Sequence, residues 1–299
     1  MPDVPLTIIR NPTSGRGRRS RDWLQIENRL QQLGAEILRT DYKGHATELA
    51  KGAATRGGVV VAAGGDGTLN EVVTGLVGTG ATLGLIPLGT GNDFGRALGI
   101  NLTNAFDTLV HGERKRIDLA TWSCSNREGV FINVAGCGFD AVVADRINTG
   151  YRYLSGTPAY VASVLGTLGT YIPANLRLEV DSQILETSAM LCAVANATSY
   201  GGGMRVAPDA DVSDGLLDIV VVQGVGRMEF LRAFPSVFKG THTKHPKVKV
   251  MRGRHIHIES DRPLPVLADG ELVGLTAATF KVLPGAIQVM VPGAAQRPV

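Results

Sequence analysis

The first third of the chain alternates continuously apolar runs with stretches that have helical spacing. The apolar runs are PLTIIRNP (5–12), AEILRTD (35–41), GVVVAAG (58–64) and TLGLIPLG (82–89). Between them, SRDWLQIENRLQQLG (20–34) places Trp23, Ile26, Leu30 and Leu33 on one predicted helix face, and further helices are expected at 45–57, 68–78 and from Asn92. Strands that are apolar throughout are buried on both faces, so the pattern predicts a parallel sheet covered by helices.

The pattern changes near Asp118. From there on the chain reads mostly as strands separated by glycine and polar turns, and only 138–170 and 226–240 look helical. This predicts an antiparallel β domain with a sandwich architecture. Because no low-complexity linker marks the change, we place an α/β domain at 1–118 and a β-sandwich domain at 119–287 without a sharp boundary.

Composition limits the classes of partner that the protein is expected to bind. The 299 residues are 44% hydrophobic and 19% charged, with a net charge of +3 that is too small to indicate nucleic acid binding. Basic residues nevertheless cluster at 16–21, 113–116 and 244–255. These clusters are either solvated loops or a surface that faces anionic phosphates or lipid headgroups.

The cysteines and the apolar runs bear on localisation. Cys124, Cys137 and Cys192 fit neither a disulfide framework nor a zinc site, which predicts reduced thiols in a cytosolic protein. The start of the chain has no signal-peptide pattern. AYVASVLGTLGTYI (159–172) is shorter than the ~18 apolar residues that a membrane span needs. We therefore expect a cytoplasmic protein without a transmembrane segment that associates with membranes peripherally.

Candidate chemistry lies at the strand ends of the first domain, where ligands bind in open α/β sheets. NPTSG (11–15), GGDGT (64–68) and PLGTGNDFGR (87–96) each follow a predicted strand. Their small residues expose backbone N–H groups, and two of these loops lead into helix N-termini, which suggests phosphate binding. Asp66 cannot hold a phosphate itself, but it can bind Mg²⁺, and Asp93 is expected on the neighbouring loop. A tight turn before a capped helix is the simpler alternative for GGDGT alone.

Two standard nucleotide-binding motifs, the P-loop and the dinucleotide fingerprint, find no good match in the sequence. The P-loop pattern is absent from the sequence, and GCGFDA (136–141) matches a dinucleotide fingerprint only weakly, without a carboxylate at the expected offset. We interpret GCGFDA as a strand-to-helix turn. The paired histidines in HTKH and HIH are interpreted as surface or strand residues.

These residues together resemble the diacylglycerol kinase catalytic family, in the bacterial soluble lipid kinase branch that is also similar to sphingosine and ceramide kinases. NPTSG, GGDGTLNEVV, PLGTGNDFGR, NVAGCGFDA, APDADVSDGLLDIV and LADGE follow that family's order across residues 11 to 271. GGDGT alone would be shared with NAD kinases, so PLGTGNDFGR is the specific part. The resemblance implies an N-terminal nucleotide domain like those of NAD kinases and phosphofructokinases, a C-terminal β-sandwich, and completion of the first domain by residues 288–299.

The resemblance also implies a set of functional residues. It places ATP at Asn11, Pro12, Thr13, Ser14, Gly15, Thr40, Gly65, Asp66, Gly67, Thr68, Leu69, Asn70, Glu71, Thr90 and Asn92. It implies that Asp66 and Asp93 organise catalytic Mg²⁺ and that Glu271 is the catalytic base. A structural metal is implied at Asp214 with the backbone oxygens of Asp211 and Leu216. A base makes chemical sense here, because a lipid hydroxyl is a poor nucleophile until its proton is removed.

The sequence leaves several alternatives open. The function expected is an ATP- and Mg²⁺-dependent lipid kinase acting at an anionic membrane surface, and the alternatives are an NAD kinase or a catalytically silent nucleotide- or lipid-binding regulator. The acceptor could be diacylglycerol, phosphatidylglycerol, a sphingosine-like base or ceramide. The pocket for it is expected in the β domain, with 151–172 as one candidate lining. Oligomeric state is open, with a homodimer as one option.

Overall fold

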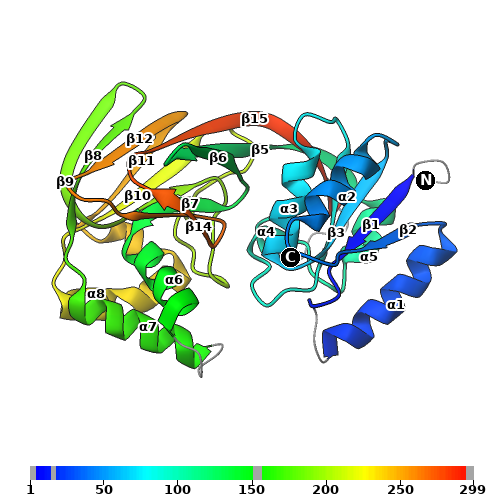
Figure 1. Ribbon diagram of the computed structural model, residues 1–299, viewed down its shortest axis with the longest axis horizontal. Helices are drawn as coiled ribbons and strands as arrows, with labels where there is room; N and C mark the ends of the chain where they lie inside the picture. Colours follow the sequence, from blue (N-terminus) through cyan, green and yellow to red (C-terminus); the bar gives the residue numbers. More distant parts are fainter. Residues whose placement is uncertain (1–4, 15–17, 151–156, 294–299) are drawn as a thin grey trace. The chain divides into compact units, whose positions relative to one another are not determined.

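A computed structural model describes residues 5–14, 18–150 and 157–293. The chain divides into two compact units, each considered by itself (Figure 1). Unit 1 comprises Met1–Leu119 and Pro284–Val299, and unit 2 comprises Ala120–Leu283. Two long strands, β5 (Glu113–Cys124) and β15 (Ala278–Val291), continue from one unit into the other.

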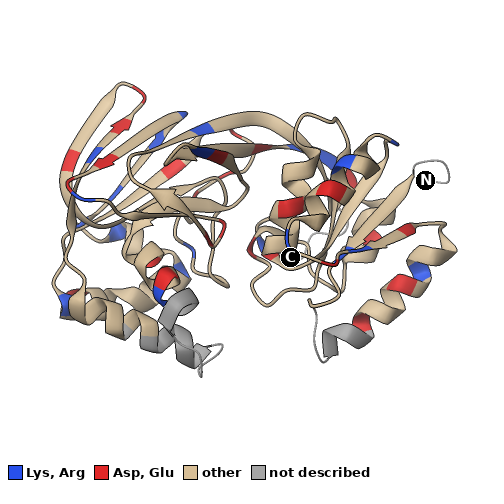
Figure 2. Cartoon of the chain, in the orientation of Figure 1, with Lys and Arg blue, Asp and Glu red and all other residues tan. Residues whose placement is uncertain are grey.

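Unit 1 contains the predicted parallel sheet. Its strands are β1 (Leu6–Arg10), β2 (Glu36–Arg39), β3 (Val59–Gly64) and β4 (Thr82–Pro87). They lie in the order β4, β3, β1, β2, and every neighbouring pair is parallel. β3 and β4 are buried at every position and carry no charged residue, and the ribbon of β3 is accordingly tan in Figure 2. The α/β prediction is confirmed, since strands buried on both faces require cover from helices.

The described residues of unit 1 form five helices that connect or follow these strands: α1 (Arg18–Gln32), α2 (His45–Ala54), α3 (Asp66–Leu76), α4 (Asp93–Ala97) and α5 (Ala105–His111). α2 and α3 approach closely at Gly75, where an added Cβ would lie 2.6 Å from the Thr47 carbonyl oxygen. The predicted face of α1 is correct at Trp23, Ile26 and Leu30, which are buried, but wrong at Leu33. The helix ends at Gln32, so Leu33 falls beyond it and is 53% exposed.

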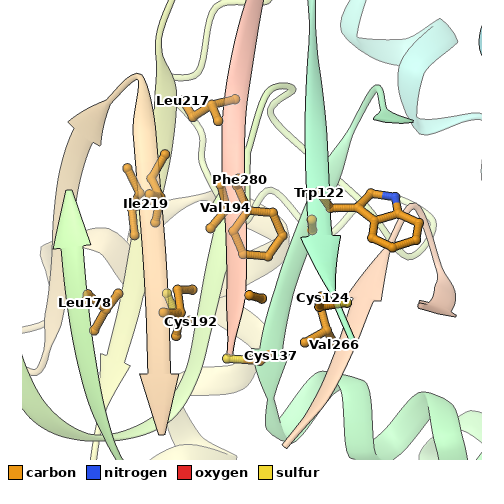
Figure 3. Packing of buried hydrophobic residues seen from close by; sticks show 14 of the residues in the cluster. Trp122, Cys124, Cys137, Leu178, Cys192, Val194, Leu217, Ile219, Val266 and Phe280 are labelled. Atoms are coloured by element: carbon orange, nitrogen blue, oxygen red, sulfur yellow. The ribbon is translucent and has the colours of Figure 1, made fainter. Parts of the chain in front are cut away.

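Unit 2 is an antiparallel β-sandwich, as predicted. Besides parts of β5 and β15 it contains β6 (Arg127–Phe131), β7 (Val134–Gly138), β8 (Ala174–Val180), β9 (Gln183–Ala195), β10 (Leu217–Gln223), β11 (Val248–Gly253), β12 (His255–Ser260), β13 (Pro265–Ala268) and β14 (Glu271–Leu275). A large apolar cluster forms its core, in which Phe280 of β15 lies between Val194 of β9 and Trp122 of β5 (Figure 3). The three cysteines are free and buried.

Two strand-rich runs of this half of the chain each contain two strands. The run at 129–139 breaks between β6 and β7, and the run at 175–185 folds back as the β8–β9 hairpin. Asp181 makes that turn with φ 53°, a left-handed conformation that aspartate tolerates. GCGFDA is a strand-to-helix turn, as interpreted, because β7 ends at Gly138 and the next helix begins at Phe139.

The helical segments of unit 2 fall where the sequence predicted them, except for a short 3₁₀ helix that follows residue 240, in a stretch that was not predicted as helical. They are α6 (Phe139–Gly150), α7 (Thr157–Thr170), α8 (Arg227–Ala233) and the 3₁₀ helices η1 (Phe234–Lys239) and η2 (Thr241–Lys244). A second apolar cluster packs parts of α6, α7 and α8 against β9 and β10. Within the described part of the chain, none of the helices combines the length and apolar character needed to cross a membrane.

Candidate functional site

The loops that follow β1, β3 and β4 meet at one edge of the unit 1 sheet. The backbone N–H of Asn11 donates to the Ala63 carbonyl at 3.1 Å, and the Asn11 amide donates to the Thr68 hydroxyl at 3.0 Å. On the other side, the N–H of Leu88 donates to the Gly64 carbonyl at 2.8 Å. The three predicted loops are therefore hydrogen-bonded to one another around the N-terminus of α3.

Different structural constraints apply to the three glycines of GGDGT. An added Cβ at Gly64 would lie 2.5 Å from the Thr68 side chain, and one at Gly65 would lie 3.2 Å from Cα of Gly89. Gly64 thus allows close packing within the loop, and Gly65 allows close packing against the loop that follows β4. Gly67 is exposed and has no atom within 4 Å of an added Cβ, so packing does not explain it. An open glycine at the first turn of a helix is the arrangement that lets an anion approach backbone N–H groups.

Two carboxylates lie beside this opening. Asp66 accepts hydrogen bonds from the backbone N–H groups of Asn92 at 2.8 Å and Asp93 at 3.0 Å. An added Cβ at Gly91 would lie 2.6 Å from Asp66 Oδ2 and 3.4 Å from Asp93 Oδ2, so both carboxylates face the same glycine. Asn92 adopts φ 52°, and its amide donates to the Gly89 carbonyl at 2.7 Å, which fixes the loop between the two acids.

The electrostatics of the pair favour a cation. Burial raises the pKa of Asp66 above its ordinary value, and the neighbouring charge of Asp93 raises it further, while the two backbone N–H donors oppose the shift. Asp93 is buried and forms an ion pair with Arg96 at 2.6 Å. Two carboxylates at close quarters suit Mg²⁺, which prefers carboxylate oxygen ligands.

The remaining predicted nucleotide residues differ in how close they lie to this loop cluster. Thr40 is attached to it through its N–H, which donates to the Arg10 carbonyl at 3.0 Å, and Thr13 through the Asn11 amide oxygen. Leu69 is buried, and Thr90 is exposed. Pro12 and Ser14 lie in the loop after β1, Asn70 lies on α3, and Gly15 lies outside the described residues.

Glu71 has a structural role that the sequence did not indicate. Its carboxylate accepts from the N–H groups of Gly44 at 2.9 Å and Ala46 at 3.2 Å, at the N-terminus of α2. A carboxylate in that position satisfies backbone donors that a helix leaves unpaired and complements its dipole. Glu71 therefore holds α2 against α3.

Arg96 and Gly91 are residues of this cluster that the sequence reasoning missed. Besides pairing with Asp93, Arg96 donates to the Gly91 carbonyl at 3.0 Å, so it ties the loop to α4. The signal was present in NDFGR, where an arginine three residues after an aspartate is within reach on a helix.

In unit 2, Glu271 is the first residue of β14. Asp269 and Gly270 form the turn that joins β13 to β14, with φ values of 46° and 86°, and Ala268 pairs with Glu271 across it. The Asp269 carboxylate accepts from the N–H groups of Ile132 at 2.8 Å, Asn133 at 2.9 Å and Val134 at 3.3 Å. The turn is thereby attached to the β6–β7 connection, and Glu271 is presented as an exposed carboxylate on a fixed hairpin.

The predicted structural-metal loop lies before β10. Asp214 accepts from the Leu216 N–H at 3.0 Å, and Asp211 accepts from the Ser213 N–H at 3.0 Å. Carboxylate and carbonyl oxygens are the donors that a hard divalent ion requires, so the residues fit such an ion in chemistry. Arg252 already forms an ion pair with Asp214 and lies 3.4 Å from Asp218. Among the described residues, no group of three or more His, Cys, Asp and Glu side chains is placed to hold a metal.

Comparison with known proteins identifies related families and structures. Residues 5–122 match the diacylglycerol kinase catalytic domain, and residues 133–291 match the YegS C-terminal NAD kinase beta sandwich-like domain. A protein named diacylglycerol kinase from Mycobacterium tuberculosis (strain ATCC 25618 / H37Rv) is 35% identical over 295 residues, which cover 96% of this chain and 95% of that protein. Another of that name from Bacillus subtilis (strain 168) is 32% identical over 293 residues, covering 95% of each. The crystal structure of a candidate diacylglycerol kinase from Bacillus anthracis str. Sterne superposes with a TM-score of 0.79 at 26% identity, over 97% of this chain and 98% of that one.

Proposed function

Because the chain belongs to the diacylglycerol kinase family of lipid kinases, we propose that it transfers the γ-phosphoryl group of ATP to a hydroxyl of a membrane lipid such as diacylglycerol. The observation that carries the proposal is the pair of carboxylates, Asp66 and Asp93, facing Gly91 beside the open Gly67 at the start of α3. Phosphoryl transfer needs mainly positioning and neutralisation of charge, and this arrangement offers groups for both.

The nucleotide would be held by the loops of unit 1. The N-terminal turn of α3 and the glycines around it supply N–H groups for the phosphates, and the residues of NPTSG with Thr40 complete the ATP site. Asp66 and Asp93 would hold Mg²⁺, which neutralises the charge that develops on the transferred group. Arg96 restrains Asp93 through their ion pair at 2.6 Å, so this acid is positioned before any ligand arrives.

The base would be Glu271. Its carboxylate takes the proton of the acceptor hydroxyl, the hydroxyl oxygen forms a bond to the γ-phosphorus, and the bond between that phosphorus and the β–γ bridging oxygen breaks to release ADP. The hairpin supports this role, because Asp269 fixes the turn while Glu271 stays exposed.

The acceptor lipid would be reached at an anionic membrane surface, where the protein binds peripherally. The basic segment at 244–255 supports this, with Lys244, Lys249 and Arg254 exposed; the cluster at 16–21 lies outside the residues whose side chains are described. Cations near an anionic leaflet are attracted to it, and the attraction weakens as salt rises.

A phosphorylation assay with [γ-³²P]ATP tests the proposal. Diacylglycerol, ceramide and NAD are supplied separately, with and without Mg²⁺. Labelled phosphatidic acid formed only with Mg²⁺ supports the proposal, and labelled NADP would identify the NAD kinase alternative. No labelled product with any acceptor, despite measurable ATP binding, would favour the silent regulator.

A further inference from the structure

One helical face of unit 2 combines exposed apolar and basic side chains. Between residues 227 and 239 the exposed side chains are Arg227, Met228, Arg232, Pro235, Phe238 and Lys239, hereafter the α8–η1 face. Met228 is 61% exposed and Phe238 is 49% exposed. Met228, Arg232, Pro235 and Phe238 follow one another at spacings of four, three and three residues along α8 and η1, which places these four on one side of the helical segment, and Arg227 and Lys239 flank them.

The α8–η1 face contains no acidic side chain. The one acid in the segment is Glu229, which is half-buried, forms an ion pair with Lys247 at 2.9 Å and accepts from the Gly226 N–H at 3.3 Å. Its charge is therefore directed toward Lys247 and the start of α8. The exposed charges of the face are all positive, which is complementary to an anionic partner.

The apolar part of the face is anchored in the core. Phe139 of α6 contacts Phe230, which is 7% exposed, at a ring-centroid distance of 4.9 Å. Phe230 contacts Phe234 at 5.9 Å, and Phe234 contacts Phe238 at 6.2 Å. This row of rings holds Phe238 at the surface in a fixed place, so the exposure of its ring does not result from a loose loop end.

We propose that the α8–η1 face is the surface with which unit 2 docks on an anionic phospholipid bilayer. Met228 and Phe238 would enter the boundary between headgroups and acyl chains, while Arg227, Arg232 and Lys239 would contact lipid phosphates. An amphipathic helix with bulky apolar residues between basic ones has the chemistry of an interfacial anchor. The biological purpose of the docking, access to a bilayer lipid, rests on the proposed function, whereas the docking itself does not.

The test is cosedimentation with vesicles in the absence of ATP. Vesicles of phosphatidylcholine alone are compared with vesicles that also contain phosphatidylglycerol. The wild type should bind the mixed vesicles more tightly. The variants Met228→Asp/Phe238→Asp and Arg232→Glu/Lys239→Glu should each bind them at least about tenfold more weakly. The charge variant leaves the aromatic row intact, so it remains informative if the apolar variant folds poorly by circular dichroism.

Matched control variants test whether the loss of vesicle binding is specific to the α8–η1 face. Ile184, which is 59% exposed at the β8–β9 hairpin, provides the apolar control Ile184→Asp. Lys51 of α2 and Lys281 of β15, both exposed and outside the basic clusters, provide the charge control Lys51→Glu/Lys281→Glu. Both controls should bind like the wild type, and equal losses in face and control variants would overturn the proposal.

Further outcomes distinguish bilayer docking from dimerisation through the same face, and distinguish failure of the docking proposal from failure of the proposed function. A dimer in sedimentation velocity that the face variants dissociate, with vesicle binding unchanged, would show that a second copy occupies the face and would overturn the proposal. Face variants that lose vesicle binding but still phosphorylate detergent-dispersed diacylglycerol would support it. A wild type that binds vesicles through this face but phosphorylates no lipid would support the docking surface and refute the proposed function alone.

Discussion

At the scale of single residues, the pKa of Asp66 reflects both its burial and its proximity to Asp93. Burial raises this pKa, and the charge of Asp93 raises it further, so the fold favours the protonated form of Asp66. Its contribution to stability is therefore present below the pKa of the unfolded chain and is lost as pH rises through the higher pKa of the folded protein. A bound Mg²⁺ would reverse this preference by stabilising the ionised form.

We expect Asp93→Asn to lower the pKa of Asp66, because a like charge is removed, while burial keeps the pKa above its ordinary value. The titration of the Asp66 carboxyl carbon by NMR measures this. Asp41→Asn, at a side chain that is 78% exposed, serves as the control and should leave the titration unchanged. An Asp66 pKa that rises or stays constant in Asp93→Asn would show that the two carboxylates do not interact.

Glu271 is the second residue whose role can be isolated. Glu271→Gln should lower kcat by ~10²–10⁴-fold, the usual contribution of a general base, with ATP binding nearly unchanged. The acidic limb of the pH–rate profile should disappear, because it reports protonation of the base. Glu186→Gln, at another exposed glutamate of unit 2, should keep wild-type turnover. Wild-type turnover in Glu271→Gln would mean that another group removes the proton.

The sequence predicted the proximity of Asp66 and Asp93 because the order of the strands determines where their loops lie. Asp66 and Asp93 follow β3 and β4, which are neighbours in a parallel sheet, so their loops meet at one edge. The contacts that Arg96 and Glu71 make with backbone groups were not predictable in the same way. They depend on which backbone groups the folded chain brings within reach, the Gly91 carbonyl for Arg96 and the α2 N-terminus for Glu71.

At the scale of elements, the β13–β14 hairpin depends on Asp269. Asp269→Ala removes the acceptor of three backbone N–H groups and places alanine at a φ of 46°, so we expect a loss of roughly 2–4 kcal/mol in the free energy of unfolding. Asp269→Asn should cost less, because asparagine tolerates this conformation and keeps one acceptor oxygen. Denaturant titration measures both, and an unchanged midpoint in Asp269→Ala would contradict the account of the turn.

The loop at 211–216 offers a second test at this scale. If Asp214 and the carbonyl oxygens of Asp211 and Leu216 hold a divalent ion, Asp214→Ala should lose one ion per chain and some thermal stability, since a ligand bound only by the folded state stabilises it. Arg252→Gln should keep the ion, because it removes a competitor for the Asp214 carboxylate. Elemental analysis of the purified proteins distinguishes the two, and equal metal content in wild type and Asp214→Ala would refute the metal site.

Elements were predicted well where the pattern was long, and the short turns inside strand-rich runs were not located. The buried strands β3 and β4 and the helical stretches of unit 2 were visible as runs and periods. The strand-rich runs at 129–139 and 175–185 each contain two strands, and the sequence did not locate the turn within either run. The left-handed φ of Asp181 makes a hairpin there, which residue type alone does not reveal.

At the scale of the whole molecule, the fold class followed from the sequence because the two units obey different rules. Continuous apolar strands alternating with helices indicate a parallel sheet, and strands separated by polar turns indicate an antiparallel sandwich. The long strands β5 and β15 were less predictable. β15 pairs with β12 over its first part and with β4 near its end, and the Pro284–Gly285 pair between the two parts is typical of a turn although the strand continues through it.

The central claim is that the chain phosphorylates a lipid hydroxyl with ATP at the unit 1 carboxylate pair. The most direct measurement is the rate at which ³²P passes from [γ-³²P]ATP to diacylglycerol in mixed micelles, for the wild type and for Asp66→Ala, whose folding is checked by circular dichroism. The account predicts Mg²⁺-dependent formation of phosphatidic acid by the wild type and none above background by the folded variant. Near-normal activity in Asp66→Ala would contradict it.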